Sequence, residues 1–183
     1  MSQGQLERTT EEICGHAFAT QLGWMTLVWR DQFPYSMSFD LPTQAAAIQC
    51  LAAAKCSDVL GDADLPRRVR TWVRRLMNYA AGQKIDFLDI ELDDSECTEF
   101  QRRVIAGCRN IPRGKTLSYR ELAEIAGSPN AARAVGNVMA TNPLPLIVPC
   151  HRVVGAAGAL GGYSASSGLT MKTRLLKLEG ALG

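Results

Sequence analysis

Three prolines, at positions 143, 145 and 149, constrain the fold of this chain more than any other local feature. Proline fixes its own backbone φ at about −65° and has no amide N–H to donate. The apolar residues 146–148 lie between these prolines, and Cys150 directly follows the last of them. Such a run predicts a short buried strand or extended segment over residues 146–148. We therefore expect the cysteine side chain to be held in a fixed position.

Cys150 is followed by His151 and Arg152, which gives this segment the character of a reactive thiol site. A free cysteine has a pKa of about 8.5, so only a few per cent is thiolate near neutral pH unless a base or a positive charge lies close by. His151 and Arg152 are candidates for these neighbours. The ordinary alternative is that Cys150 is a small core residue beside a surface histidine, and the dipeptide alone favours this alternative.

Composition limits the classes of protein to which the chain can belong. With 183 residues, of which 46% are hydrophobic and 21% charged, it has the composition of a globular protein with one large or two small domains. No apolar run approaches the roughly 20 residues that span a membrane, and the N-terminus lacks the basic segment and apolar core of a secretion signal. We therefore expect a cytoplasmic protein, associated with the nucleoid in a bacterium or nuclear in a eukaryote.

The use of cysteine and histidine argues against a metal centre. The six cysteines form no C-x-x-C pair, and a core of this size needs no disulfide bonds, so we expect reduced thiols. His16 and His151 are the only histidines. Three cysteines, at positions 14, 50 and 56, could converge with His16, but their spacing matches no zinc finger or ribbon. We expect neither a metal site nor a cofactor.

Charge is distributed unevenly along the chain. Residues 1–97 carry 9 Lys and Arg against 14 Asp and Glu, whereas residues 98–183 carry 11 against 4, so the net charges are −5 and +7. The basic half contains Cys150. A basic surface beside a reactive group favours a polyanionic partner such as DNA or RNA, because neutralisation of phosphates supplies most non-specific binding. Solvated helix faces are the alternative that charge alone leaves open.

The first half of the chain predicts a small sheet with helices. Residues 1–12 are polar, and we expect them to fray. Residues 24–29 and 35–41 are rich in β-forming side chains, and the turn sequence between them predicts a hairpin. Residues 43–55 predict an alanine-rich helix, and a second helix is expected after the turn at residues 61–66.

The second helix has an apolar face with the spacing i, i+3, i+4, i+7 and i+11, and arginines on its other side. We expect these arginines to be solvated or paired with acids rather than to bind DNA. Residues 85–92 alternate as in a last strand whose buried face is ambiguous, and the acidic run at residues 93–96 marks a boundary. The apolar positions are Val69, Trp72, Val73, Leu76 and Ala80, and the arginines are Arg67, Arg70, Arg74 and Arg75.

Helix signals are sharper beyond residue 97. Thr98 and Gln101 form a capping box that predicts the start of a helix. Ser118 and Glu121 form a second capping box, and Gly127 is expected to end the short helix that follows. Each capping box satisfies two backbone N–H groups within one turn, so these starts are encoded locally.

Ser128 is the expected N-cap of the next helix, which extends through Met139. Two short helices joined by a tight Gly-Ser-Pro turn form a helix-turn-helix layout. The second of them carries small residues and one long basic side chain, Arg133. Small side chains allow a helix to approach a DNA groove, or allow close packing between helices, and the pattern leaves both open. The small residues are Ala131, Ala132, Ala134 and Gly136.

The last part of the chain predicts a glycine-rich loop and a helix. The loop at residues 155–168 contains neither a dinucleotide-binding nor a Walker pattern, so it indicates a flexible wall rather than a phosphate-binding loop. The amphipathic helix from residue 170 is expected to point Lys172, Arg174 and Lys177 outward. Glu179 lies at its C-terminus, where an acid opposes the helix dipole at a cost of about a few tenths of a kcal/mol. Glu179 is therefore expected to have another task.

Several motifs in this order resemble those of the O6-alkylguanine-DNA alkyltransferases, over roughly residues 98–180. Residues 1–97 resemble the variable N-terminal domain of that family only in length and in the order of strands and helices. The loop at residues 163–169 is longer than the shortest form in the family, and the zinc ligands of some members have no clear counterpart. The motifs are Ile111-Pro112-x-Gly114-x-Thr116-x-Ser118-Tyr119, Ala132-Arg133-Ala134-Val135-Gly136, Asn142-Pro143 through Pro149-Cys150-His151-Arg152-Val153, Gly161-Gly162-Tyr163-Ser164 and Leu175-Leu176-x-Leu178-Glu179-Gly180.

The resemblance implies an α/β (α+β) protein with two domains. Residues 1–97 would form the variable N-terminal α/β domain, a small sheet with helices. Residues 98–183 would form a mainly helical domain, similar to a winged helix-turn-helix, that binds DNA and contains the active site. The implied activity is direct DNA repair, in which the alkyl group of O6-alkylguanine, and in some cases O4-alkylthymine, is transferred irreversibly to Cys150. The thioether is a poor leaving group, so each molecule would act once.

The resemblance also implies catalytic roles. His151, oriented by Glu179, would take the proton of Cys150 through a water molecule, which is the logic of activated thiols. Tyr119 would donate a proton as the guanine leaves. Asn142 would hold the turn that positions the Tyr119 and Cys150 regions.

The implied partner is duplex DNA, bound in the minor groove by the helix at residues 128–139 of a monomeric protein. Arg133 would enter the base stack in place of the damaged base, which would flip into a pocket. The implied DNA contacts are Arg133, Tyr119, Ala132, Gly136 and Ser128, and the implied pocket residues are Val153, Tyr163, Ser164 and Pro145.

Two other classes of function are consistent with parts of the sequence. Alkyltransferase-like proteins bind lesions without repairing them, but they lack the cysteine, whereas this chain has Cys150, His151 and Glu179. A thiol enzyme that acts on small molecules is disfavoured by the basic second half and the helix-turn-helix. Strong salt dependence of DNA binding would separate this last class from the other two.

Overall fold

The computed structural model describes residues 12–163, 165 and 167–182. The predicted fraying of residues 1–12 falls almost wholly outside this part of the chain. The strands are β1 (Ile13–Thr20), β2 (Gly23–Arg30), β3 (Phe33–Leu41), β4 (Asp58–Val59), β5 (Leu117–Ser118) and β6 (Val153–Val154). The helices are α1 (Gln44–Ala53), α2 (Arg67–Ala80), α3 (Glu99–Arg109), α4 (Tyr119–Ile125), α5 (Ala132–Ala140) and α6 (Leu169–Glu179), with one-turn 3-10 helices η1 (Asp62–Asp64), η2 (Cys150–Arg152) and η3 (Ala156–Gly158).

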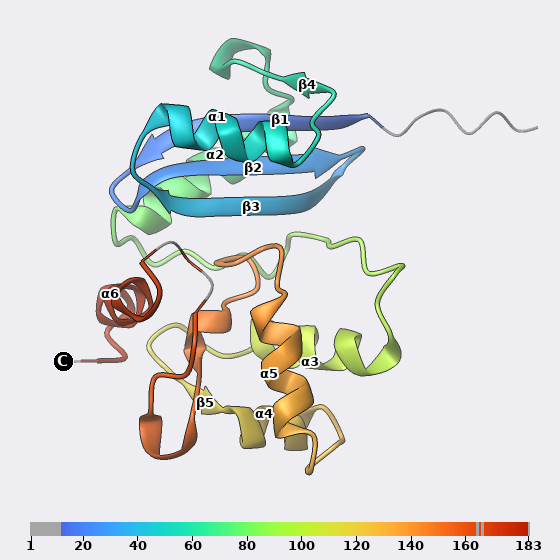
Figure 1. Cartoon of the computed structure of the whole chain (residues 1–183), viewed down its shortest axis with the longest axis vertical. Coiled ribbons are helices and arrows are strands. Elements are labelled where there is room, and N and C mark those ends of the chain that lie inside the picture. The colour runs from blue at the N-terminus through green and yellow to red at the C-terminus, as the bar shows by residue number, and fades with distance from the viewer. Residues whose placement is uncertain (1–11, 164, 166, 183) are drawn as a thin grey trace, which may run out of the picture.

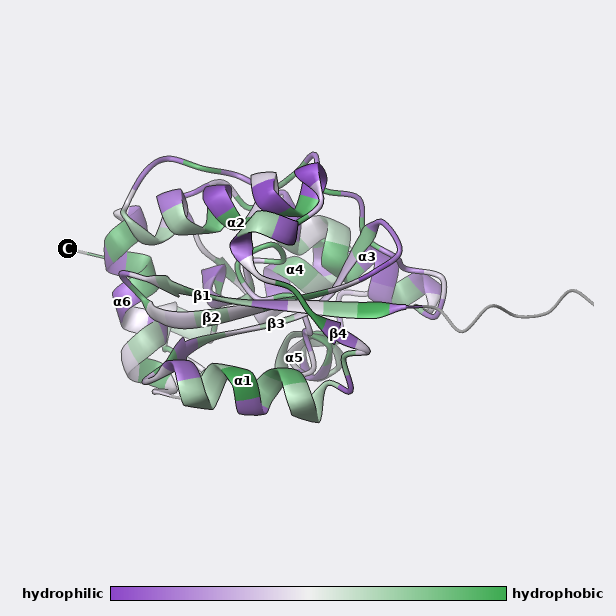
Figure 2. Cartoon of the chain, turned by 90° about the horizontal axis from the view of Figure 1, so that it is seen from above, coloured by the Kyte–Doolittle hydropathy of each residue, from purple (hydrophilic) through white to green (hydrophobic). Residues whose placement is uncertain are grey.

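The N-terminal half is a twisted sheet between two helices. Its strand order is β3-β2-β1-β4, antiparallel except for the parallel pair of β1 and β4. Helices α1 and α2 lie on opposite faces of this sheet (Figure 2). The C-terminal half gathers α3 to α6 below the sheet (Figure 1). The fold is therefore the α/β arrangement that was expected, with a small N-terminal sheet and a mainly helical C-terminal part.

Most N-terminal elements agree with the sequence analysis. The predicted hairpin is β2 and β3, and Asp31 adopts a positive φ of 54° at the turn between them. Both predicted helices are present, and Thr43 caps α1 by accepting a hydrogen bond from the Ala46 amide. Strands β1 and β4 were not predicted. Strand β4 has two residues, and its pairing with β1 joins segments far apart in the sequence, so a local pattern does not reveal it.

The predicted strand at residues 85–92 is wrong. This segment has no strand hydrogen bonds and crosses the molecule as a loop. Arg109 on α3 donates to the carbonyl groups of Phe87, Leu88 and Ile90, at 2.7, 3.0 and 2.7 Å. On the other side, Arg75 forms an ion pair with Asp89 at 2.7 Å, so this arginine is paired with an acid, one of the two expected outcomes. Two arginines thus take the place of a neighbouring strand in satisfying this backbone.

The two capping boxes are confirmed. Thr98 and Gln101 exchange both hydrogen bonds at the start of α3, and Ser118 and Glu121 do the same at the start of α4. Each pair lies three residues apart, so the sequence alone was sufficient. Gly127 has a φ of 71° after α4, as expected for a helix end.

The expected start of α5 is wrong by three residues. Ser128 is not an N-cap, because the helix begins at Ala132 and its N-cap residue, Ala131, has no side-chain capping bond. The Ser128 carbonyl instead accepts a hydrogen bond from the Ala131 amide at 2.9 Å, which closes a separate turn. The helix-turn-helix connection is therefore longer than predicted.

The expected extended run at residues 146–148 is a tight turn. Pro145 and Val148 form an isolated bridge, and Leu146 between them has a φ of 76°. A left-handed conformation is unfavourable for a branched side chain and persists only where its surroundings enforce it. Leu146 is 2% exposed, so burial of its side chain offsets the strain. The expectation that Cys150 has a fixed position does not depend on this error.

One hydrophobic core runs through both halves of the molecule, from Met25 and Leu27 in the sheet to Val135 in α5 and Leu175 in α6. A backbone hydrogen bond from Met37 in β3 to the Pro143 carbonyl, at 2.8 Å, also joins the halves. All six cysteines are free thiols, as predicted. Of the helices in the described ranges, none combines the length and apolar character needed to cross a membrane.

Candidate active site

Cys150 is the first residue of η2, a single turn that follows Pro149. The amide of Arg152 closes this turn by donating to the Pro149 carbonyl at 2.9 Å. The chain then enters β6, which pairs in parallel with β5 directly before α4. This pairing fixes the thiol relative to the start of α4. Cys150 is 4% exposed, so its thiol is almost fully enclosed.

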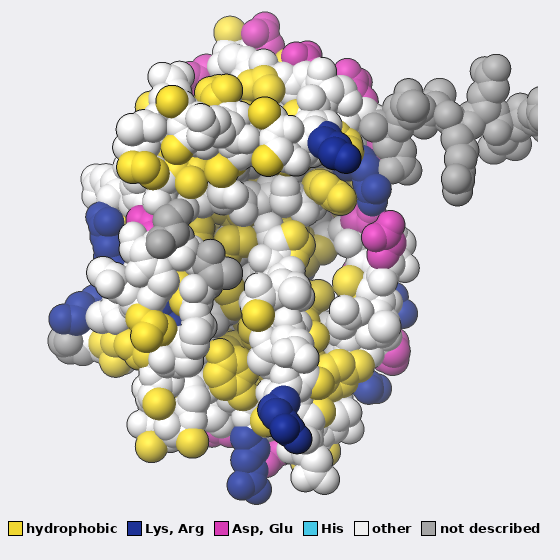
Figure 3. Space-filling model, viewed as in Figure 1, with side chains coloured by type: hydrophobic (Ala, Val, Ile, Leu, Met, Phe, Trp, Pro, Cys, Tyr) yellow, Lys and Arg dark blue, Asp and Glu magenta, His cyan; other side chains and the backbone are white. Residues whose placement is uncertain are grey.

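The thiol faces a cavity of about 330 Å³ between α5 and the loop before α6. This face of the molecule is hollowed beside α5 and shows hydrophobic side chains (Figure 3). Tyr119 and Tyr163 provide two aromatic walls, while Gly136 provides a wall without a side chain. A cavity of this size can hold a planar heterocycle. Its lining residues are Tyr119, Gly136, Met139, Ala140, Cys150, Gly162 and Tyr163.

The surroundings of Cys150 act on its pKa in opposite directions. Burial raises the pKa of the thiol, whereas hydrogen bonding to Asn142, the positive charge of Lys172 and the hydroxyl of Tyr163 lower it. The net pKa lies above the ordinary value. Cys150 is therefore a thiol at rest, and it needs a base to become the nucleophile.

His151 is the base that the structure offers, and it is 0% exposed. Its Nε2 lies 3.1 Å from Oε1 of Glu179. Burial lowers the pKa of His151, and this outweighs the opposing hydrogen bond and charge of Glu179. A neutral imidazole that donates from Nε2 to a carboxylate has an unprotonated Nδ1, an assignment that follows from the hydrogen-bond network. Nδ1 of His151 is buried and has no hydrogen-bond partner among the described residues.

Arg152 holds Glu179 through two hydrogen bonds. Its Nε donates to Oε2 of Glu179 at 2.9 Å, its Nη2 donates to Oε1 at 2.8 Å, and its Nη1 donates to the Ile111 carbonyl at 2.6 Å. Burial opposes ionisation of Glu179, but the hydrogen bonds from His151 and Arg152 lower its pKa well below the ordinary value. Glu179 thus has the task that its unfavourable place in α6 suggested. The guanidinium of Arg152, a candidate charge beside the thiolate, is engaged by Glu179 and by the Ile111 carbonyl.

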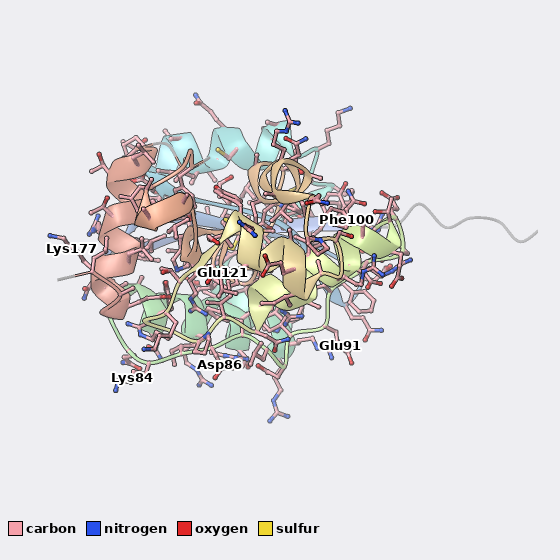
Figure 4. All side chains as sticks on the ribbon, turned by 90° about the horizontal axis from the view of Figure 1, so that it is seen from below. Lys84, Asp86, Glu91, Phe100, Glu121 and Lys177 are labelled. Carbon is pink, nitrogen blue, oxygen red and sulfur yellow. The ribbon has the colours of Figure 1, made fainter. Side chains whose placement is uncertain are left out.

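Lys172 is the cation near the thiol, and the expectation that it points outward is wrong. Its side chain is 0% exposed, and its Nζ donates to the Val153 carbonyl at 2.7 Å. Burial lowers the pKa of Lys172, while the charge of Cys150 raises it. Lys177 on the same helix does point away from the molecule (Figure 4). Helical periodicity therefore placed one of these two lysines correctly.

Asn142 holds the turn before the active site. Its Nδ2 donates to the Val148 carbonyl at 2.8 Å, and its Oδ1 accepts a hydrogen bond from the Leu144 amide at 3.0 Å. These bonds close the turn that contains Leu146. Asn142 also lowers the pKa of the Cys150 thiol, so the residue that closes the turn acts on the thiol as well.

Of the residues expected to contact DNA, Tyr119 and Gly136 line the cavity, whereas Arg133, Ala132 and Ser128 do not. Tyr119 is half-buried at the first position of α4, and its ring packs so closely on Gly161 that a Cβ there would lie 3.0 Å from the hydroxyl oxygen. Gly136 faces the same ring from α5. Arg133 is exposed one turn earlier on α5, beside the half-buried Ala132. Ser128 lies in the turn before the helix and is half-buried.

The residues expected to form the pocket are only partly brought together. Tyr163 lines the cavity, and its hydroxyl is buried without a hydrogen bond of normal geometry to any described residue. Val153 is buried behind Cys150 and contributes its carbonyl rather than a lining side chain. Pro145 is buried in the turn and does not line this cavity. Ser164 lies outside the described residues.

The sequence analysis missed Tyr79, which comes from α2 in the N-terminal half. Its hydroxyl donates to Oε1 of Glu179 at 2.6 Å and lies 3.4 Å from Nε2 of His151. Tyr79 is separated from Glu179 by 100 residues in the sequence. A buried aromatic residue on an amphipathic helix gives no local signal for such a contact.

A second cavity, of about 520 Å³, lies beside Arg152 and Glu179, but Cys150 does not line it. The chemistry of the thiol therefore assigns the smaller cavity to the substrate. In the described ranges, no group of three or more His, Cys, Asp or Glu side chains is arranged to hold a metal ion.

Comparison with known proteins identifies relatives of this chain. The family model described as 6-O-methylguanine DNA methyltransferase, DNA binding domain, matches residues 99–181. The methylated-DNA–protein-cysteine methyltransferase of Mycolicibacterium paratuberculosis is 50% identical over 114 residues, which are 62% of this chain and 67% of that protein. The protein of the same name from Methanosarcina acetivorans is 49% identical over 59% of this chain and 67% of its own length. In the relative from Mycobacterium leprae the alignment spans 62% of the protein.

Solved structures are similar over nearly the whole chain. The crystal structure of Mycobacterium tuberculosis O6-methylguanine methyltransferase superposes with a TM-score of 0.71 and 32% identity, covering 93% of this chain and 94% of that one. A structure of the Mycobacterium tuberculosis protein in complex with DNA superposes with a TM-score of 0.68, also at 32% identity, covering 91% of this chain and 92% of that one.

Proposed function

The chain belongs to the 6-O-methylguanine DNA methyltransferase family, and from this premise we propose that it repairs DNA by transferring an alkyl group to Cys150. It is a methylated-DNA–protein-cysteine methyltransferase that binds DNA, like the relatives of that name and the neighbour that was solved with DNA. The substrate we propose is O6-alkylguanine in duplex DNA, with O4-alkylthymine as a second candidate. The reaction is stoichiometric and irreversible.

One observation carries this proposal: Cys150 faces a cavity of about 330 Å³ while its neighbour, His151, is paired with Glu179 on the buried side. A nucleophile, a base and an acid that orients the base are the three parts of an activated thiol. The cavity lies between Tyr119 and Tyr163, which supply aromatic faces for a base. A binding protein without chemistry would need none of the three.

In the mechanism we propose, His151 accepts the thiol proton of Cys150 at Nδ1, through a bridging water molecule. The thiolate then attacks the alkyl carbon, so that an S–C bond forms as the bond from that carbon to O6 of guanine breaks. Tyr119 donates a proton to the departing guanine, which leaves as a neutral base. Burial and the nearby Cys150 raise the pKa of Tyr119, so the phenol keeps its proton until negative charge develops on the guanine.

Binding of DNA is proposed to use the exposed face of α5. Arg133 extends from this helix, and the small side chains of Ala132 and Gly136 allow a close approach of the backbone to the minor groove. The arginine would fill the space left by the flipped base. Ser128 would contact the backbone from the turn before α5.

The supporting roles follow from position. We propose that Asn142 holds the turn and the thiol, and that Val153 supports the pocket through its carbonyl, which holds Lys172 near the thiol. Pro145 is proposed to support the pocket from the turn that contains Leu146. We also propose a monomer, a cytoplasmic location and two domains, at residues 1–97 and 98–183, of which the second carries the chemistry.

The test is transfer of a methyl group in vitro. The protein is incubated with duplex DNA that contains O6-methylguanine and is then digested with trypsin, and the peptide that spans residues 134–152 is weighed. The expected result is a gain of one methyl group on Cys150. A Cys150→Ser variant should gain nothing, whereas Cys97→Ser, which removes a half-buried thiol outside the site, should react like the wild type.

An unmodified Cys150 in protein that has demonstrably bound the damaged duplex would refute the proposal. Salt dependence provides the second measurement. A protein that binds phosphates should lose affinity steeply as salt increases, and an enzyme for small molecules should not.

A further inference from the structure

Tyr79 connects the N-terminal half to the catalytic groups. It lies on α2, is 1% exposed, and donates its hydroxyl proton to Oε1 of Glu179 at 2.6 Å. Burial and the negative charge of Glu179 raise the pKa of Tyr79 well above its ordinary value, so the phenol stays protonated and remains a donor. This hydrogen bond is the shortest that Glu179 makes within the described part of the chain.

Three donors converge on one carboxylate oxygen. Oε1 of Glu179 accepts from Tyr79 at 2.6 Å, from Arg152 at 2.8 Å and from His151 at 3.1 Å. The hydrogen bonds from Tyr79 and Arg152 reduce the negative charge that acts on His151, and all three bonds together fix the plane of the carboxylate. The hydroxyl of Tyr79 thus competes with the imidazole for the same acceptor.

The ring of Tyr79 is itself fixed. The guanidinium of Arg113 lies over it, 5.4 Å from the ring centre, and the ring of Phe87 lies at 5.9 Å on a tilted plane. Arg113 also donates to the carbonyl of Leu178, the residue before Glu179, at 2.7 Å. The position of the phenol is therefore tied to the end of α6 by two routes.

We propose that Tyr79 is a positioning residue for the alkyl transfer, supplied by the N-terminal half, which holds Glu179 in the orientation that leaves the Nδ1 atom of His151 free as the base. The inference rests on the proposed function for its catalytic consequence. It gives residues 1–97 a defined part in the chemistry.

The groups that face His151 determine what loss of the phenol does. Glu179 and Lys172 face it from α6, Tyr79 faces it from α2, and Cys150 and Arg152 flank it in the chain. Removal of the Tyr79 hydroxyl leaves more of the carboxylate charge acting on His151, which favours imidazolium. Imidazolium carries a proton on Nδ1 and cannot accept the proton of the thiol. A higher pH is therefore required to form the neutral imidazole that acts as the base.

The experiment uses the full chain with Tyr79→Phe, which keeps the ring and removes only the hydroxyl. Tyr35→Phe is the matched control, because it removes a hydroxyl from an exposed tyrosine in β3. The first readout is the NMR titration of the imidazoles. The chain has only two histidines, so His16 serves as an internal reference. The expected result is that the midpoint of His151 rises in Tyr79→Phe while that of His16 stays unchanged.

The second readout is the pH dependence of methyl transfer from O6-methylguanine duplex. The acid limb should move to higher pH. The rate at neutral pH should fall about fivefold, which is the change that corresponds to the net contribution of one hydrogen bond. In a Glu179→Gln background, Tyr79→Phe should have no further effect, because its effect passes through the carboxylate. Tyr35→Phe should match the wild type throughout.

An unchanged His151 midpoint together with an unchanged acid limb would overturn the inference, as would losses that add fully in the double variant. These outcomes differ from failure of the proposed function. A wild-type protein that never gains a methyl group would refute that function, whereas the titration of His151 is read without any substrate.

Discussion

The ammonium of Lys172 donates a hydrogen bond to the carbonyl of Val153 at 2.7 Å, although its side chain is completely buried. This pair lies directly behind Cys150. The positive charge of Lys172 also lowers the pKa of the Cys150 thiol. Lys172 therefore links the backbone at Val153 to the reactivity of the Cys150 thiol.

The Lys172→Met variant should react more slowly at neutral pH. Methionine has a similar length and no charge, so the pKa of Cys150 should rise. The rate of alkylation by iodoacetamide, measured against pH, should then begin to increase at a higher pH than in the wild type. Lys177→Met is the matched control, because Lys177 is exposed on the same helix. Identical profiles for the wild type and Lys172→Met would show that the lysine does not act on the thiol.

Glu179→Gln should destabilise the protein. The substitution leaves Arg152 buried without its carboxylate, and removal of one partner of a buried ion pair costs about 3 kcal/mol or more. Chemical denaturation should show a lower midpoint with an unchanged slope. Glu124→Gln removes an acid that pairs with Arg120 on the surface, and it should change stability by less than about 1 kcal/mol. Equal losses in the two variants would contradict the buried network.

Stability should fall as the solution is acidified. The pKa of His151 is lowered in the folded state from its ordinary value of 6.5, so the unfolded chain binds a proton first as the pH decreases. The pKa of Glu179 is lowered from 4.5, which adds a second loss below that pH. The contribution of His151 is complete above about pH 6.5 and that of Glu179 above about pH 4.5, and each decreases as the pH falls below that value. Urea denaturation at a series of pH values should show this, and His151→Gln should flatten the upper part of the decrease.

Arg133→Ala should weaken repair of duplex DNA more than reaction with free O6-benzylguanine. Arg133 is exposed on α5 and does not line the Cys150 cavity, so the chemistry itself should survive. Only the duplex needs a base to be extruded. Single-turnover rates on the two substrates measure the difference. Equal losses on both would remove Arg133 from the role of filling the base stack.

The sequence alone predicted the features that depend on hydrogen bonds between residues close together in the chain, such as the starts of helices. The capping boxes at Thr98 and Ser118 join groups three residues apart, and both helix starts are confirmed. The dipeptide of Cys150 and His151 alone favoured a core cysteine, and only the motifs around it pointed to a reactive thiol, whereas the unfavourable place of Glu179 in its helix indicated a partner elsewhere. These features depend on residues near one another in the chain or on one helix dipole, so a single sequence contains them.

Tertiary structure decided the rest. Lys172 lies on a helix whose pattern placed it outside, but α6 packs against η2 on that side. Residues 85–92 alternate like a strand, but Arg75 and Arg109 satisfy their backbone instead. Tyr79 meets Glu179 across 100 residues of sequence. Periodicity shows which residues can share a face and not which distant group will face them, because that depends on how the elements pack together.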